Sequence, residues 1–216
     1  MIRGLTLPQI IQLVVIILIS LTVHEFAHSL VAIALGDETP RKQGRLTLNP
    51  FAHIDLVGFL MLILVGFGWA KPVVFNPASL KKPRRDEILI ALAGPISNMI
   101  LAMVGVVIVW AVLTTNALVS RGSITAFFGF MWLFVSINIG LAVFNMIPIP
   151  PLDGSHMVTV FLQKVNATLA ATYFRYGSYA LLALVVFQLI TKIEVLPISR
   201  LVDAVARWMF GLLGIQ

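Results

Sequence analysis

Long apolar runs dominate the chain and predict membrane-crossing helices. Three of these runs, residues 8–35, 87–114 and 124–147, exceed the roughly 20 residues that a helix needs to cross a bilayer. We expect these three to form a helical core, and we expect a further span at residues 173–194. The pattern predicts an all-α polytopic membrane protein with about four to six membrane-embedded helices, arranged as a single domain over residues 1–216.

The apolar stretch at residues 54–70 is shorter than the roughly 20 residues that a helix needs to cross a bilayer, and three glycines interrupt it. The loops that flank it, residues 36–53 and 71–87, carry three and five basic residues, whereas the connection between the second and third core helices has only Arg121. Because basic loops stay in the cytoplasm, both flanking loops are predicted to lie on that side. Residues 54–70 should then form a re-entrant or interfacial segment.

Two stretches in these loops have a strand-like pattern. "RLTL" at residues 45–48 alternates polar and apolar positions, and "KPVVF" at residues 71–75 resembles an extended edge segment next to prolines. We therefore expect short β-hairpin or edge-strand segments here, one of which could pair with an extended substrate. At the other end of the chain, residues 197–214 predict an amphipathic helix that lies at the membrane interface.

Composition agrees with a multi-pass membrane protein, which we expect to lie in the cell (plasma) membrane. The chain is 59% hydrophobic and only 11% charged, and its mean hydropathy is +1.00. The formal charge of +6 lies mostly in the connections between apolar runs, so we expect the lipid bilayer as a partner and no nucleic acid. Cysteine is absent. Any metal ion must therefore be held by His, Asp or Glu.

The first apolar run contains "HEFAH", an H-E-x-x-H motif. On a helix, His24 and His28 project from one face and can bind one zinc ion, while Glu25 lies beside the metal as a general base. Ionisable groups inside a membrane span are costly unless they are paired or ligated, which favours a functional role for all three. The motif predicts metal-assisted hydrolysis.

A catalytic zinc site needs a third protein ligand. Asp153 is the strongest candidate, because "PIPPLDG" follows a span directly and a carboxylate buried there needs a partner. Two other interpretations remain open. Another class of H-E-x-x-H membrane metalloprotease takes its third ligand from a downstream glutamate, and a non-catalytic metal-binding membrane adaptor or carrier could use the same polar cluster.

Three motifs together carry a family resemblance: "HEFAH" in an apolar helix, "GPISN" at residues 94–98 and "NMIPIPPLDG" at residues 145–154. The chain resembles the site-2 protease family of intramembrane zinc metalloproteases, in a short form without a PDZ or CBS domain. The resemblance implies one zinc ion per chain, with His24, His28 and Asp153 as its ligands and Glu25 as the general base. It also implies transmembrane protein substrates, cleaved within or near the bilayer in regulated intramembrane proteolysis, and an active site that opens toward the cytoplasm.

Further predictions concern four other polar residues. The side-chain amide of Asn145 could stabilise the oxyanion of the reaction, as the resemblance also suggests, or it could only fix a helix end. We expect His53 and His156 to lie at surfaces or helix ends, and Asn98 to form a hydrogen bond across a helix contact. A homo-oligomer is neither indicated nor excluded by the sequence.

Overall fold

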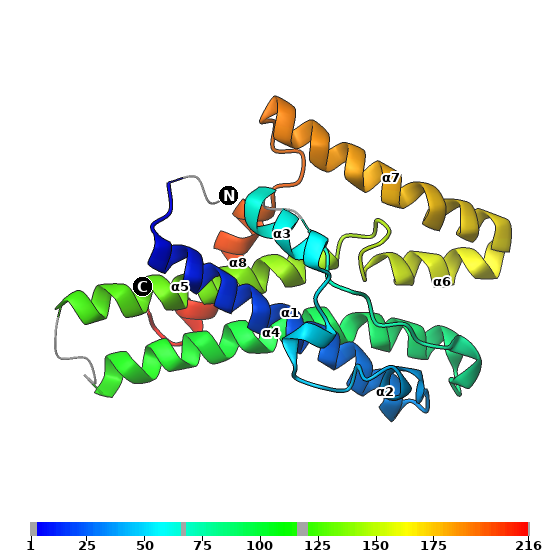
Figure 1. The fold of residues 1–216 in the computed structure, drawn as a ribbon, viewed down its shortest axis with the longest axis horizontal. Coiled ribbons are helices and arrows are strands. Elements are labelled where there is room, and N and C mark those ends of the chain that lie inside the picture. Colours follow the sequence, from blue (N-terminus) through cyan, green and yellow to red (C-terminus); the bar gives the residue numbers. More distant parts are fainter. Residues whose placement is uncertain (1–3, 66–67, 116–120, 216) are drawn as a thin grey trace.

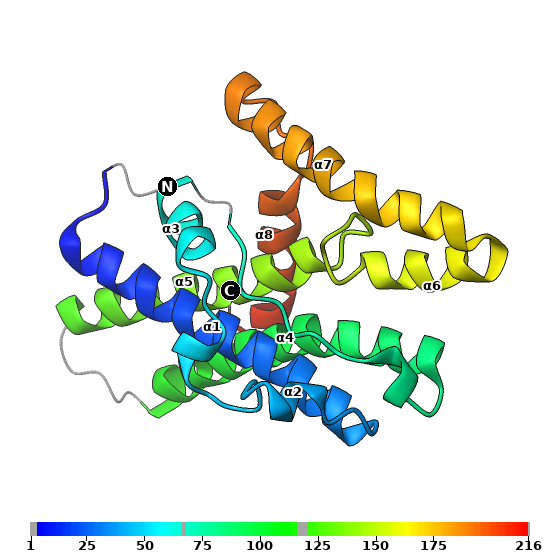
Figure 2. The same ribbon diagram turned by 45° about the vertical axis from the view of Figure 1, so that its right-hand side comes forward.

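Three long helices lie side by side at the centre of the molecule (Figures 1 and 2). They are α1 (Leu7–Ala34), α4 (Pro83–Thr115) and α5 (Arg121–Asn145). The fold is taken from a computed structural model, which describes residues 4–65, 68–115 and 121–215, the side chains of residues 121–123 excepted. α4 packs against both α1 and α5, so side chains from all three helices can meet.

Shorter elements fill the connections and the C-terminal part. They are α2 (Thr39–Lys42), the 3-10 helix η1 (Pro50–Ala52), α3 (Leu56–Val65), the 3-10 helix η2 (Pro77–Ser79), α6 (Ser155–Val165), α7 (Ala167–Thr191) and α8 (Ile198–Leu212). α8 packs on α5, whereas α7 has α6 as its main neighbour and extends away from the central helices (Figure 2).

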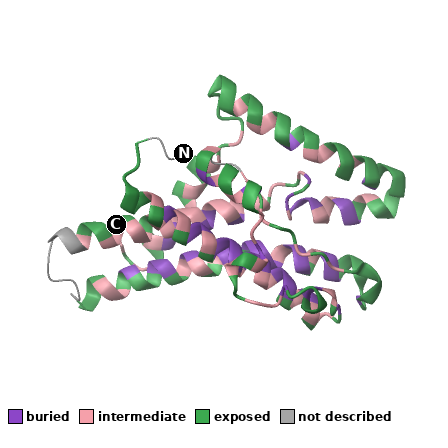
Figure 3. Cartoon of the chain, viewed as in Figure 1, coloured by how far each residue is buried: buried purple, intermediate pink, exposed green. Residues whose placement is uncertain are grey.

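Among the described residues, four helices are long and apolar enough to cross a membrane: Leu7–Ala34, Pro83–Thr115, Ile124–Asn145 and Ala167–Thr191. The prediction of an all-helical membrane protein is therefore confirmed. Burial follows the same plan, because buried residues gather where α1, α4 and α5 face one another and α7 is mostly exposed (Figure 3). Apolar side chains on the outer faces of these helices suit contact with lipid rather than water.

The predicted β-hairpin and edge strands are wrong. Within the described ranges the chain contains no strand: residues 46 and 47 form bends, and residues 71–75 run extended without a partner strand. In the first stretch the Thr47 N–H donates to the Arg45 carbonyl, and in the second the Lys71 and Pro72 carbonyls bind the Arg45 side chain instead of a neighbouring strand. Backbone groups can be satisfied by side chains as well as by a ladder.

α3 occupies the centre of the stretch predicted to be re-entrant. Its ten residues would be about 15 Å long, roughly half of the hydrocarbon thickness of a bilayer. The chain that follows α3 folds back against it, since a Cβ atom on Gly58 would lie 2.8 Å from the Trp69 ring. α3 alone is too short to cross, and its insertion into the membrane stays a prediction.

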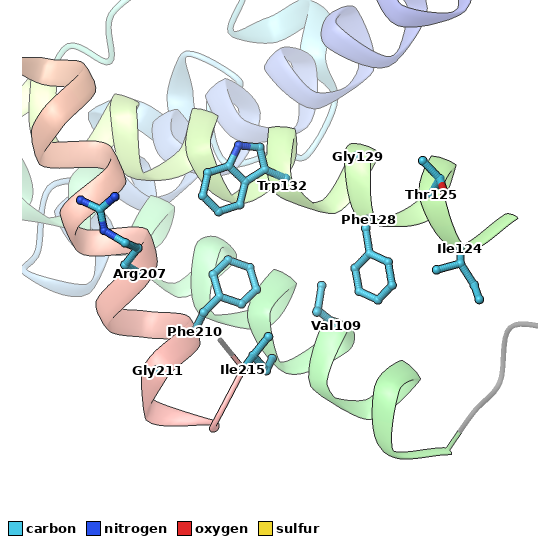
Figure 4. A pocket seen from close by; sticks show the side chains of 10 residues that line it. All are labelled: Val109, Ile124, Thr125, Phe128, Gly129, Trp132, Arg207, Phe210, Gly211 and Ile215. Carbon is cyan, nitrogen blue, oxygen red and sulfur yellow. The ribbon is translucent and has the colours of Figure 1, made fainter. Parts of the chain in front are cut away.

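A wide apolar groove of about 950 Å³ lies between α4, α5 and α8. Figure 4 shows the rings of Phe128, Trp132 and Phe210 along it and Arg207 on α8 at its side. Trp132 and Phe210 stack with 5.9 Å between ring centroids, which joins α8 to α5. The lining of the groove contains none of the residues predicted to bind metal.

Candidate metal centre

His24 and His28 lie one turn apart on α1, and both side chains are buried. Their Nε2 atoms face Asp153, at 3.1 Å from Oδ2 for His24 and 3.4 Å from Oδ1 for His28. One ligand atom from each of the three residues lies within 4.8 Å of the others. The structure thus brings together the three predicted ligands, from positions up to 129 residues apart in the chain (153 − 24).

The other ring nitrogen of His24 is held by Asn98 on α4. His24 Nδ1 lies 2.6 Å from Asn98 Oδ1. The Asn98 amide nitrogen donates to the Ser20 carbonyl at 3.2 Å and to Asn138 Oδ1 at 2.9 Å, which assigns the Asn98 oxygen to the histidine side. Since an amide oxygen only accepts, His24 Nδ1 carries the proton and its Nε2 presents a lone pair.

His28 is fixed in the same tautomer by the backbone of α4. Its Nδ1 lies 2.7 Å from the carbonyl oxygen of Ile90, which can only accept. The proton is therefore on Nδ1, and Nε2 is free to bind a metal. Two groups on α4 thus orient both imidazoles so that each Nε2 lone pair can bind a metal ion.

Asp153 belongs to the loop between α5 and α6. The Gly154 N–H donates to the Asn145 carbonyl at 2.7 Å, and the Tyr173 hydroxyl on α7 donates to the Pro148 carbonyl at 2.7 Å. A metal ligand must be deprotonated, so Asp153 would bind as the carboxylate.

The facing atoms of the three residues fit a bound cation. Asp153 Oδ2 is buried and has no hydrogen bond to the described residues. With the proton of His24 on Nδ1, its Nε2 and Asp153 Oδ2 are two acceptors facing each other at 3.1 Å. Such a contact is unfavourable unless a cation lies between them or a proton is shared. Two imidazoles and one carboxylate are also a donor set that zinc accepts.

Gly94 on α4 lies beside the ligand nitrogens of His24 and His28, and its lack of a side chain leaves room for the two rings. A Cβ atom at this position would lie 2.5 Å from both Cε1 and Nε2 of His24, and it would also collide with His28 Nε2. A glycine is thus required where α4 passes the two rings.

Glu25 is buried beside the two histidines, 7% exposed. The structure records no hydrogen bond or ion pair between its carboxylate and the described residues. A carboxylate in this environment is free to accept a proton from a water molecule. No glutamate takes part in the cluster of His24, His28 and Asp153, which among the described residues argues against the class with a glutamate as third ligand.

The remaining candidates lie elsewhere. The Asn145 amide donates to the Leu141 carbonyl at 3.0 Å, one turn back on α5, so its role toward an oxyanion stays a prediction. His53 is buried at the end of η1, with Nε2 2.8 Å from the Thr47 carbonyl. His156 lies in the first turn of α6, and its Nδ1 is 2.9 Å from Glu87.

The sequence predicted that Asn98 forms a hydrogen bond across a helix contact, but it did not reveal that the partner is His24, a predicted zinc ligand. Asn98 joins α1, α4 and α5 in one buried hydrogen-bond network. The signal in the sequence was its position four residues after Gly94, on the face of α4 that turns toward the histidines. That face could be identified only once α4 was known to pack on α1.

Replacing Asn98 by alanine should weaken zinc binding by about 10- to 100-fold, because His24 loses the partner that fixes its tautomer. Titration of the metal-free protein in detergent with zinc and a competing chelator measures this change. Asn166→Ala is the matched control, since Asn166 caps α7 far from the histidines in the sequence and holds no ligand. Equal zinc affinity of the Asn98→Ala variant and the wild type would contradict this assignment.

Comparison with known proteins identifies a peptidase family and relatives that are named as zinc metalloproteases. The profile of peptidase family M50 matches residues 12–121 and 112–188. A Bacillus subtilis (strain 168) protein named "Putative zinc metalloprotease YwhC" is 40% identical over 146 residues, which cover 68% of this chain and 67% of that protein. A Mycolicibacterium smegmatis protein named "Putative zinc metalloprotease Rip2" is 29% identical over 204 residues, 92% of this chain and 73% of that protein. No solved structure matches the chain significantly.

Proposed function

Since the chain belongs to peptidase family M50, the site-2 protease family that its motifs resemble, we propose that it is a zinc-dependent intramembrane endopeptidase. Its substrates are transmembrane proteins, whose peptide bonds it hydrolyses within or near the bilayer. The observation that carries the proposal is the convergence of His24, His28 and Asp153 in the structure, with the buried Glu25 next to His24 in α1. These groups lie in or next to helices that are long enough to cross a membrane.

One zinc ion per chain would be held by His24 Nε2, His28 Nε2 and a carboxylate oxygen of Asp153. When bound, zinc would polarise the scissile carbonyl and lower the pKa of the attacking water. Asn98 and the Ile90 carbonyl keep the protons of both rings on Nδ1, so that the lone pairs point to the metal.

Glu25 takes the proton from the attacking water and passes it to the leaving amine. Its burial keeps this proton away from bulk solvent, and its place next to His24 in α1 fixes its distance from the ligands. Asn145 is proposed as a donor to the oxyanion: the Leu141 carbonyl engages one hydrogen of its amide, and the second is available.

The substrate must be unwound before its scissile carbonyl is exposed, and the extended segment after α3 offers it a partner. The backbone groups of Val73, Val74 and Phe75 form no hydrogen bonds to the described residues. In a bilayer, unsatisfied backbone groups are costly, so an incoming extended chain would be stabilised by pairing with them. We place the site toward the cytoplasmic side of the cell membrane, because the basic loop 36–53 follows the end of α1 that carries His28, and the basic loop 71–87 leads into the start of α4 that contacts it.

Removal of zinc tests the function. The purified protein in detergent should contain one zinc ion per chain and cleave a transmembrane peptide; a strong chelator should abolish cleavage, and added zinc should restore it. Cleavage that survives complete loss of the metal would contradict the proposal. A chain that binds zinc yet cleaves no transmembrane peptide would instead favour the adaptor or carrier.

A further inference from the structure

The extended segment between α3 and η2 is held at its first end by the loop before α3. The Lys71 N–H donates to the His53 carbonyl at 2.8 Å. The Arg45 guanidinium donates to the carbonyl oxygens of Lys71 and Pro72, at 2.5 Å each. Arg45 also donates to the Ala52 carbonyl, so one side chain ties two loops together.

Arg45 is an unusual residue for this position because it is buried. Only 4% of its surface is exposed, and within the described part of the chain no carboxylate forms an ion pair with it. Backbone carbonyls bind its guanidinium, and the charge of the Glu25 carboxylate also acts to stabilise it. A planar guanidinium has five donors in a fixed fork, which a lysine ammonium cannot reproduce across several carbonyls. A buried charge satisfied in this way defines the position of the groups that surround it.

The other end of the segment is held by a second buried charge. Asp37, 1% exposed, accepts from the Asn76 N–H through Oδ2 at 2.6 Å. Its Oδ1 accepts from the backbone and the hydroxyl of Thr39. Although burial acts to raise it, these hydrogen bonds hold the pKa of the Asp37 carboxyl below its usual value. The carboxylate therefore stays charged at neutral pH.

Between these two attachments, the backbone groups of residues 73–75 form no hydrogen bonds to the described residues. Val73 and Phe75 are half-buried, whereas Val74 between them is 56% exposed, which is the alternation of an extended chain. Phe75 packs against the buried cluster of Ala32, Leu80 and Ile90, on the stretch of α4 whose Ile90 carbonyl holds His28. The free edge is thus anchored close to the zinc helices.

We propose that Arg45 and Asp37 are positioning residues that hold residues 71–76 extended as a docking edge for the substrate backbone. This inference rests on the proposed function. Neither residue touches the predicted zinc ligands, which are held by Asn98 and by the backbone of α4. Loss of either attachment should therefore impair substrate binding and leave the metal in place.

Kinetics of matched variants test this role. Arg45→Met and Asp37→Asn should each raise KM for a transmembrane peptide by about tenfold, the loss expected for about 1.4 kcal/mol of binding, and both should keep one zinc ion per chain. The kcat value should change little in Asp37→Asn, which leaves the Arg45 charge near Glu25 in place. Arg41→Met is the control, because Arg41 is an exposed arginine of the same loop that pairs with Glu38. Unchanged KM in both variants, or loss of zinc together with kcat, would overturn the inference.

A cross-linking measurement tests the docking edge itself without requiring turnover. The chain has no cysteine, so Val74→Cys introduces a single thiol on the exposed side of the segment. It should form a disulfide with a cysteine placed near the scissile bond of the substrate, and Arg45→Met should reduce the yield severalfold. Val57→Cys on α3, 61% exposed, is the control. Equal cross-linking at both positions, or no effect of Arg45→Met, would contradict the inference.

The two proposals fail in different ways. If the wild type neither holds zinc nor cleaves the peptide, the proposed function is wrong. If the wild type cleaves the peptide and the Arg45 and Asp37 variants match it in KM and cross-linking, only the docking edge is wrong.

Discussion

Replacing Gly94 by alanine should remove zinc from the protein. A Cβ atom at this position would lie 2.5 Å from His24 Nε2 and would collide with His28 Nε2 as well. Both nitrogens are predicted ligands, and the rings cannot move away without breaking the bonds of their Nδ1 atoms to Asn98 and Ile90. We expect zinc affinity to fall by roughly 100-fold or more, which is a larger loss than the one expected when His24 loses only its hydrogen bond to Asn98.

Zinc content of the purified variant, measured by elemental analysis, checks this result. Gly129→Ala is the control, because a Cβ atom at Gly129 on α5 would meet nothing within 4 Å and alanine favours a helix. Gly105→Ala adds a second control on α4, since a Cβ atom there would collide with Val135 and press on Phe134 but would meet no histidine. A Gly94→Ala protein with a full complement of zinc would show that the metal is not bound beside α4.

Replacing Glu25 by glutamine should reduce cleavage by about 10²- to 10⁴-fold, the usual contribution of a general base. Glutamine has nearly the shape of glutamate but cannot accept the proton of the attacking water. Glu25 forms no hydrogen bond or ion pair with the described residues and is not among the three predicted ligands. The substitution should therefore change the chemistry and leave both the fold and the metal in place.

The membrane helices were predictable because their signal is local. Apolar runs of sufficient length specify a spanning helix whatever surrounds them, and α1, α4, α5 and α7 are the four long helices that result. The strand-like pattern of residues 45–48 and 71–75 failed because a strand depends on a partner. Here no partner strand is present, and the buried Arg45 side chain binds the Lys71 and Pro72 carbonyls, which alternation in the sequence does not reveal.

The candidate ligands were predictable for a different reason. H-E-x-x-H encodes the spacing of a helix, so His24 and His28 share a face wherever α1 lies. Asp153 could be chosen because few acidic residues remain and its proline-rich surroundings are unusual. Asn98 and Gly94 could not be assigned to the histidines, since their roles arise from the packing of α4 on α1. The same limit applies to Arg45 and Asp37, whose partners lie up to 39 residues away.

The most direct test of a zinc-dependent intramembrane peptidase is a paired measurement on wild type and Glu25→Gln, purified in detergent. Zinc per chain and the rate of cleavage of one transmembrane peptide are determined on the same preparations. The structure and the family predict one zinc ion in both proteins and cleavage by the wild type alone. A Glu25→Gln protein that cleaves the peptide at the wild-type rate would contradict the account.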